Sequence, residues 1–103
     1  MSNYKKIIEH YGISSQLKHF QSEVFELSEA IIQMGYPTIG AIGHKPQCLI
    51  DIEKKHIAEE IADCLVMIRQ FKEYYDIPND EIKNVMRYKV KRQLERIKNE
   101  KGE

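Results

Sequence analysis

The chain has 103 residues, 42% of them hydrophobic and 31% charged, with 16 basic and 16 acidic residues and two cysteines. This length suits a single domain, residues 1–103, and the zero net charge argues against general binding to duplex nucleic acid, where a basic face supplies most of the affinity. No segment approaches the roughly 18 apolar residues of a membrane helix, and neither the cysteines nor the N-terminus indicates secretion, so we expect a cytoplasmic protein without membrane contact.

Two helices are predicted in the first third of the chain. Asn3 to Tyr11 forms a short helix that Gly12 ends. Ser14 or Ser15 then caps a long helix that continues to about Met34. The apolar positions of the long helix follow a three-four alternation: Leu17, Phe20, Val24, Leu27, Ile31 and Met34. This alternation is typical of a helix that packs against near-parallel partners in a bundle.

Residues 35–50 hold three of the five glycines and two of the three prolines, so no regular element is expected there. A connection of this length usually crosses a bundle or covers a site. His44 and Lys45 are candidates for contacting an anionic ligand, although such residues are more often ordinary loop residues.

Two further helices are predicted in the rest of the chain. Asp51 opens the third, which runs to about Tyr75, and a turn containing Pro78 separates it from a last helix of about residues 81–98. No segment shows strand alternation bounded by turn signals. The sequence therefore predicts an all-α fold that resembles a four-helix bundle.

Acidic residues three positions apart flank the apolar stripe of both long helices. Glu23 and Glu26 form one pair, and Glu60 and Asp63 form the other. Residues with this spacing lie on one face of a helix, so four carboxylates can converge on one point. Hard oxygen ligands select Mg²⁺ or Mn²⁺, and the pattern predicts a Mg²⁺ site. Solvated helix faces would give the same pairs without a metal.

Other polar residues of the helices could serve such a site. A histidine precedes each acidic pair by one turn, His19 and His56, and could donate to a phosphate or a base or simply pack. On the last helix Lys89, Arg92 and Arg96 share a narrow arc that could bind phosphates, or form a solvated basic face. Four tyrosines are candidates for stacking on a base or for packing at an interface: Tyr36, Tyr74, Tyr75 and Tyr88.

This layout resembles the MazG-like all-α nucleoside triphosphate pyrophosphohydrolases, especially the short phage and Gram-positive type. Their pattern E-E-x-x-E, then E-x-x-D on the next helix, is similar to residues 22–26 and 60–63 here, and residues 88–97 are similar to their basic K-x-x-R segment. Ser22 stands where many members have the first glutamate. The resemblance spans about residues 11–97.

The resemblance implies hydrolysis of a nucleoside triphosphate to a monophosphate and pyrophosphate. Glu23, Glu26, Glu60 and Asp63 would be the catalytic residues and would hold Mg²⁺, with Mn²⁺ as an alternative. Lys89, Arg92 and His56 would bind the substrate, and a carboxylate such as Glu59 would accept the proton of the attacking water. A homodimer or homotetramer is expected, with the nucleotide near a subunit interface.

Two functions of other classes fit the same residues. The first is a non-catalytic helical interaction or regulatory protein whose acidic residues are merely exposed. The second is a di-iron carboxylate bundle, which requires two E-x-x-H motifs. This chain has one such motif, Glu53-Lys54-Lys55-His56, so a di-iron site would require a symmetric dimer.

Overall fold

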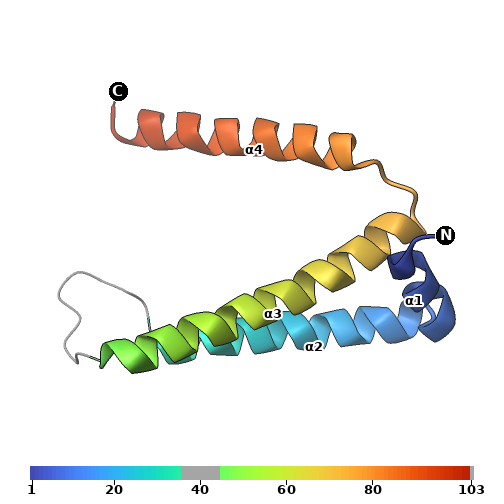
Figure 1. Ribbon diagram of the computed structural model, residues 1–103. Helices are drawn as coiled ribbons and strands as arrows, with labels where there is room; N and C mark the ends of the chain where they lie inside the picture. The colour runs from blue at the N-terminus through green and yellow to red at the C-terminus, as the bar shows by residue number, and fades with distance from the viewer. Residues whose placement is uncertain (36–44, 103) are drawn as a thin grey trace.

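The computed structural model describes residues 1–35 and 45–102. It contains the helices α1 (Asn3–Tyr11), α2 (Ile13–Met34), α3 (Gln47–Tyr74) and α4 (Asn79–Glu100). All regular structure in the described ranges is helical, which confirms the all-α prediction (Figure 1). No helix in these ranges is long and apolar enough to cross a membrane.

Three helix starts differ from the predicted ones. The first residue of α2 is Ile13, so Ser14 and Ser15 lie inside the helix, because Gly12 at φ +89° turns the chain directly from α1 into α2. Likewise α3 begins after Pro46, four residues before the predicted start at Asp51, and α4 begins after Pro78. Proline lacks an N–H, and the start of a helix needs none there. The prediction of an irregular segment is therefore wrong for residues 47–50, while residues 36–44 lie outside the described ranges.

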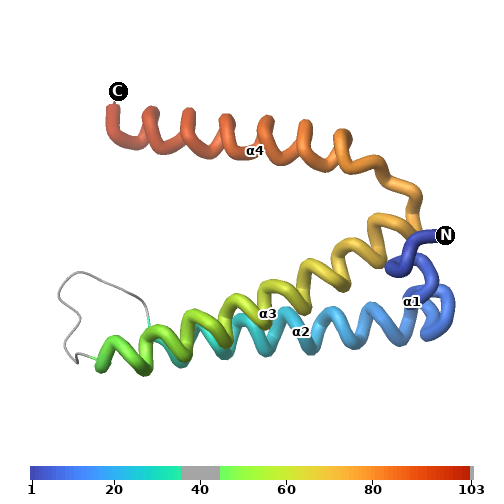
Figure 2. Tube along the Cα trace, in the orientation of Figure 1, coloured from blue at the N-terminus to red at the C-terminus, as the bar shows by residue number. Residues whose placement is uncertain are grey.

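The packed part of the molecule consists of α1, α2 and α3. The two long helices α2 and α3 run antiparallel along their length, and α1 packs against both near one end (Figures 1 and 2). Phe20 and Phe71 meet edge-on with ring centroids 5.6 Å apart, which joins α2 to α3. The buried hydrophobic residues of the described ranges are few: Ile8, Ala30, Cys64 and Met67.

Helix α4 stands apart from the other three. None of its Cα atoms comes within 8 Å of a Cα in α1, α2 or α3. The radius of gyration is 18.0 Å, whereas a compact domain of this length would have about 13 Å. Its large apolar side chains are exposed: Val85, Met86, Tyr88, Val90, Leu94 and Ile97. Within the described ranges, one chain thus forms a three-helix unit and a free fourth helix, not the closed four-helix arrangement that the sequence predicts.

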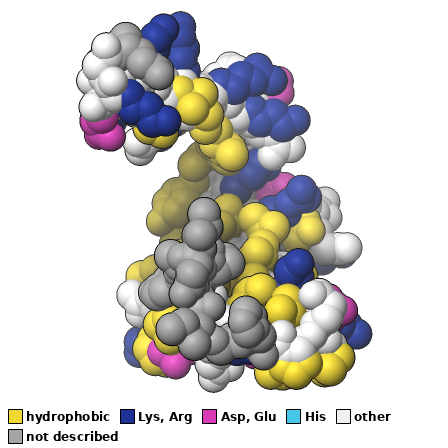
Figure 3. Space-filling view, turned by 90° about the vertical axis from the view of Figure 1, so that its left-hand side faces the viewer, with side chains coloured by type: hydrophobic (Ala, Val, Ile, Leu, Met, Phe, Trp, Pro, Cys, Tyr) yellow, Lys and Arg dark blue, Asp and Glu magenta, His cyan; other side chains and the backbone are white. Residues whose placement is uncertain are grey.

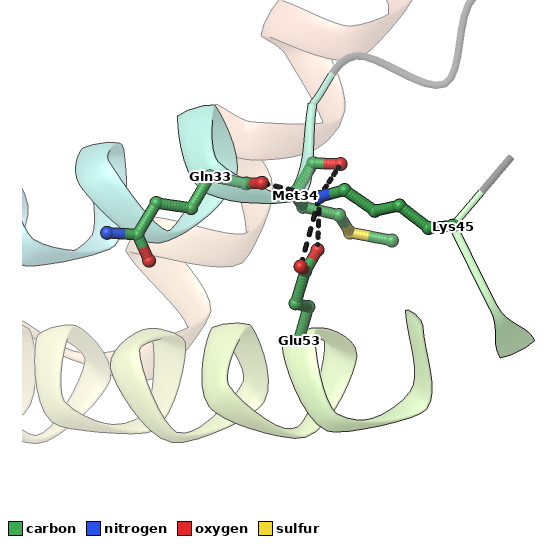
Figure 4. A network of polar contacts seen from close by, with 4 residues as sticks. All are labelled: Gln33, Met34, Lys45 and Glu53. Carbon is green, nitrogen blue, oxygen red and sulfur yellow. Dashed lines mark hydrogen bonds and ion pairs between the residues drawn. The ribbon is translucent and has the colours of Figure 1, made fainter. Parts of the chain in front are cut away.

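Lys45 connects the end of α2 to the beginning of α3 (Figure 4). Its ammonium group donates to the carbonyl oxygens of Gln33 and Met34 at 2.6 and 3.0 Å, and to both carboxylate oxygens of Glu53 at 3.0 and 2.9 Å. A cation at this end of a helix neutralises the negative end of its dipole and satisfies carbonyl groups that lack intrahelical partners. Lys45 therefore has a structural role, and its ammonium group is not free to contact an anionic ligand.

The substitution Lys45→Ala is expected to destabilise the protein by about 1–2 kcal/mol, because the C-terminus of α2 loses its cation and the half-buried Glu53 loses its partner. Urea denaturation followed by far-UV circular dichroism measures this change. The control Lys54→Ala removes an exposed lysine from α3 and is expected to leave the midpoint within error. Equal midpoints for both variants would contradict the role given to Lys45.

Candidate functional site

Three of the four predicted carboxylates converge between α2 and α3. Glu23 and Glu26 of α2 and Glu60 of α3 each offer one oxygen, and these three oxygens lie within 4.8 Å of one another. The helical repeat explains the convergence, because Glu23 follows Gln16 and Phe20 on the face of α2 that meets α3. Glu60 likewise precedes Cys64 and Met67 on the buried face of α3. We refer to these three residues as the acidic cluster.

Two residues of the acidic cluster are largely withdrawn from water, whereas Glu26 is exposed. Glu60 is only 9% exposed, and Glu23 is largely buried. One oxygen of Glu23 lies 2.9 Å from Nε2 of His19, but Oε2 of Glu23 and Oε2 of Glu60 are buried without a hydrogen-bond partner in the described ranges. A buried polar atom without a partner is destabilising. Carboxylate oxygens that converge in this way are the ligands that Mg²⁺ and Mn²⁺ prefer, so the donor set fits either ion.

The environment of the cluster opposes a negative charge on Glu60. Burial raises the pKa of Glu60 above its ordinary value, and the neighbouring carboxylates of Glu26, Asp63 and Glu23 raise it further. His56 acts in the opposite direction, but its Nε2 is 3.9 Å from Oε1 of Glu60 and its side chain is half exposed. Burial and the same carboxylates also raise the pKa of the Cys64 thiol.

The remaining predicted site residues are not part of the acidic cluster. Asp63 is exposed and is not among the three converging residues, but it lines the same pocket as Glu23. His56 flanks Glu60 and does not line that pocket. Lys89 and Arg92 lie on α4, which contacts none of the other helices, so a single chain in this conformation does not bring them to the acidic cluster. In Figure 3 basic side chains lie beside hydrophobic ones in the upper part of the molecule, where α4 is found.

A pocket of about 620 Å³ opens beside the cluster, between α1, α2 and α3. The predicted residues Glu23, Asp63 and His19 line it, together with residues that the sequence pattern did not single out, among them Gln16 and Gln70. The sequence did contain a signal for Gln16, because it precedes Glu23 by two helical turns and therefore lies on the same face of the helix. Of the tyrosines predicted to stack on a base, Tyr74 and Tyr75 pack edge-on against each other at 5.0 Å, and Tyr36 lies outside the described ranges.

Comparison of the chain with protein-family models, curated proteins and solved structures finds no match. The resemblance noted in the sequence therefore remains a hypothesis, and the function has to be argued from the residues themselves.

The free energy of unfolding of the metal-free protein is expected to fall as the pH rises. Because the pKa of Glu60 is raised in the folded state, that state keeps its proton to higher pH than the unfolded chain. The stabilising contribution is complete below the ordinary pKa of a glutamic acid, near 4.5, and is lost as the pH rises through the raised value. Urea denaturation in the presence of a chelator, repeated between about pH 4 and pH 8, measures this trend.

The variant Glu60→Gln should remove most of this pH dependence and be at least as stable as the wild type at neutral pH. The control Glu29→Gln makes the same change of charge at an exposed position of α2 and should keep the wild-type trend. Excess Mg²⁺ should stabilise the wild type more than Glu60→Gln. A wild-type protein whose stability rises from pH 5 to pH 7 would contradict this account.

Proposed function

We propose that the protein is a metal-dependent nucleoside triphosphate pyrophosphohydrolase of the MazG-like type. The observation that carries the proposal is the convergence of Glu23, Glu26 and Glu60 with two buried oxygens that lack partners. Acidic residues of an ordinary solvated helix face have no reason to be withdrawn from water side by side, as Glu23 and Glu60 are, because their mutual repulsion then grows. A bound divalent cation supplies that reason.

Mg²⁺ or Mn²⁺ would be held by the acidic cluster together with Asp63, which faces the adjoining pocket. Such an ion would neutralise phosphate oxygens and lower the pKa of the attacking water. The carboxylates of this chain would hold the ion, since they would otherwise repel the phosphates. Glu59, exposed on α3 beside Glu60, would accept the proton of the water in place of the glutamate that Ser22 replaces.

The leaving pyrophosphate needs cations, and α4 supplies them. This helix carries seven basic residues and four acidic ones, and Lys89, Arg92 and Arg96 follow one another on the same side. In one chain they are separated from the acidic cluster. The proposed site is therefore complete only when α4 of a second copy covers it, as in a homodimer or homotetramer.

The surface of the chain favours a second copy. The accessible surface is 8514 Å², whereas a compact monomer of 12.2 kDa would expose about 6,100 Å². The difference exceeds what one partner buries in a standard-size interface. Apolar residues of α2 and α3 are about half exposed, among them Leu17, Val24, Ile61 and Leu65, and could pack on the exposed apolar stripe of α4.

The same exposed stripe would also serve a non-catalytic helical interaction protein, which is the second candidate function. The two candidate functions predict different effects of Mg²⁺. A pyrophosphohydrolase requires Mg²⁺ for turnover, whereas an interaction protein with incidental acidic residues would show neither turnover nor a metal-dependent melting temperature.

Hydrolysis of a panel of NTPs and dNTPs with Mg²⁺ should release pyrophosphate in one step. In ¹⁸O-water the label is expected in the monophosphate, because the water attacks the α-phosphorus. Glu60→Gln and Asp63→Asn should abolish release of pyrophosphate while the helical circular dichroism signal is kept, and Glu29→Gln should retain activity. Stepwise formation of a diphosphate and orthophosphate, or full activity in both site variants, would overturn the proposal.

Mixing an inactive variant with an impaired one tests whether α4 acts on the partner chain. Lys89→Ala should lower kcat/KM roughly 10- to 150-fold, because a charge-assisted bond to phosphate is lost. After the variants Glu60→Gln and Lys89→Ala are unfolded together and refolded, half of the dimers combine one chain of each. One of the two sites in such a dimer has both intact parts, so about a quarter of wild-type activity should return. No recovery would mean that α4 acts on its own chain or not at all.

A further inference from the structure

The pocket beside the acidic cluster has two chemically different ends. Glu23 and Asp63 line one end, while Ile7, Tyr11 and Ser15 line the other. The residues of α2 in the pocket extend from Ser15 to Glu23, a rise of about 12 Å along the helix axis. The charged end suits phosphate and metal, and the other end combines aromatic, aliphatic and amide groups, which suits a planar heterocycle.

A buried chain of hydrogen bonds fixes the amide group in the pocket floor. Nε2 of Gln16 donates to Oε1 of Gln70 at 2.8 Å, and Nε2 of Gln70 donates to the sulfur of Met67 at 3.5 Å. Gln16 is 5% exposed and Gln70 is 2% exposed, so both amides are held inside the fold. Since Gln70 takes up one N–H of Gln16, the Oε1 of Gln16 and its second N–H remain without partners in the described ranges.

The free edge of the Gln16 amide therefore presents an acceptor beside a donor. The order of donors and acceptors along the edge differs from one nucleobase to another, so an amide held in one orientation pairs better with some bases than with others. The ring of Tyr11, 61% exposed at the rim of the pocket, is available for stacking on such a base. Orientation by a second buried amide is what a specific contact needs, because it limits the freedom that Gln16 would otherwise lose on binding.

We propose that this pocket is the nucleobase subsite, in which Gln16 reads the base edge, Gln70 positions Gln16, and Tyr11 stacks on the base. The proposal rests on the proposed function for the placement of the triphosphate at the Glu23 end. It adds the residues that select among bases, which the acidic cluster and the basic helix cannot do because they contact only phosphates and metal.

Two variants test the subsite independently. Tyr11→Ala changes an exposed residue and should raise KM for nucleoside triphosphates roughly 5- to 100-fold with little change in kcat. The control Phe25→Ala removes an aromatic residue of similar exposure, 64%, that does not line this pocket, and should leave KM unchanged. Gln16→Met keeps the side-chain length but lacks the amide, and should reduce the spread of kcat/KM among the four bases about tenfold. Inhibition by inorganic tripolyphosphate, which has no base, should be the same in all variants.

Titration of the metal-free protein, kept in a chelator, with the four nucleosides separates this proposal from the proposed function. Two-dimensional NMR follows the titration. Chemical-shift changes at Tyr11 and Gln16 in the wild type, with the change at Gln16 lost in Tyr11→Ala, would support the subsite even if no triphosphate were hydrolysed. Hydrolysis in the wild type with unchanged KM and unchanged base preference in Tyr11→Ala and Gln16→Met would overturn the subsite and leave the proposed function standing. Absence of both nucleoside binding and hydrolysis would overturn both.

Discussion

Repulsion among the carboxylates of Glu23, Glu26 and Glu60 is the constraint on which the rest of the structure depends. These residues occupy the contact between α2 and α3, where two long antiparallel helices would ordinarily bury apolar side chains. The helices are held together on one side of the cluster by the pair Phe20–Phe71 and the hydrogen bond between Gln16 and Gln70. On the other side Lys45 joins their ends through Glu53. The cluster therefore lies between two sets of contacts that join α2 to α3, and these contacts keep the carboxylates close despite their charge.

Helical periodicity accounts for most of what the sequence could predict. The repeat of apolar residues placed all four helices, and the spacing of acidic residues placed Glu23, Glu26 and Glu60 on facing sides of α2 and α3. Periodicity was less informative at helix ends, where backbone geometry decides. Gly12 adopts a positive φ, so α2 begins at the next residue. Helix α3 begins directly after Pro46, before its predicted start at Asp51.

Tertiary placement could not be predicted from periodicity. An apolar stripe on α4 shows that something covers it, but not whether the partner is the same chain or another, so the separation of Lys89 from the acidic cluster was not foreseen. Gln16 was missed for a different reason. A glutamine on an apolar face is usually taken as an interruption of the core, and only the structure shows that Gln70 lies opposite to pair with it.

The two flanks of the α2–α3 pair differ in a way that separates assembly from catalysis. At 100° per residue, Leu17 and Val24 fall on the flank of α2 opposite to His19 and Glu26. A small apolar cavity of about 230 Å³, lined in part by Leu17 and Phe71, lies on that flank, while the large pocket with Glu23 and Asp63 lies on the other. A second copy that packs on the apolar flank would leave the large pocket open to substrate. In the proposed dimer, α4 of that copy would have to cross the end or edge of the α2–α3 pair to reach the acidic cluster, so the site would be complete only with α4 in that position.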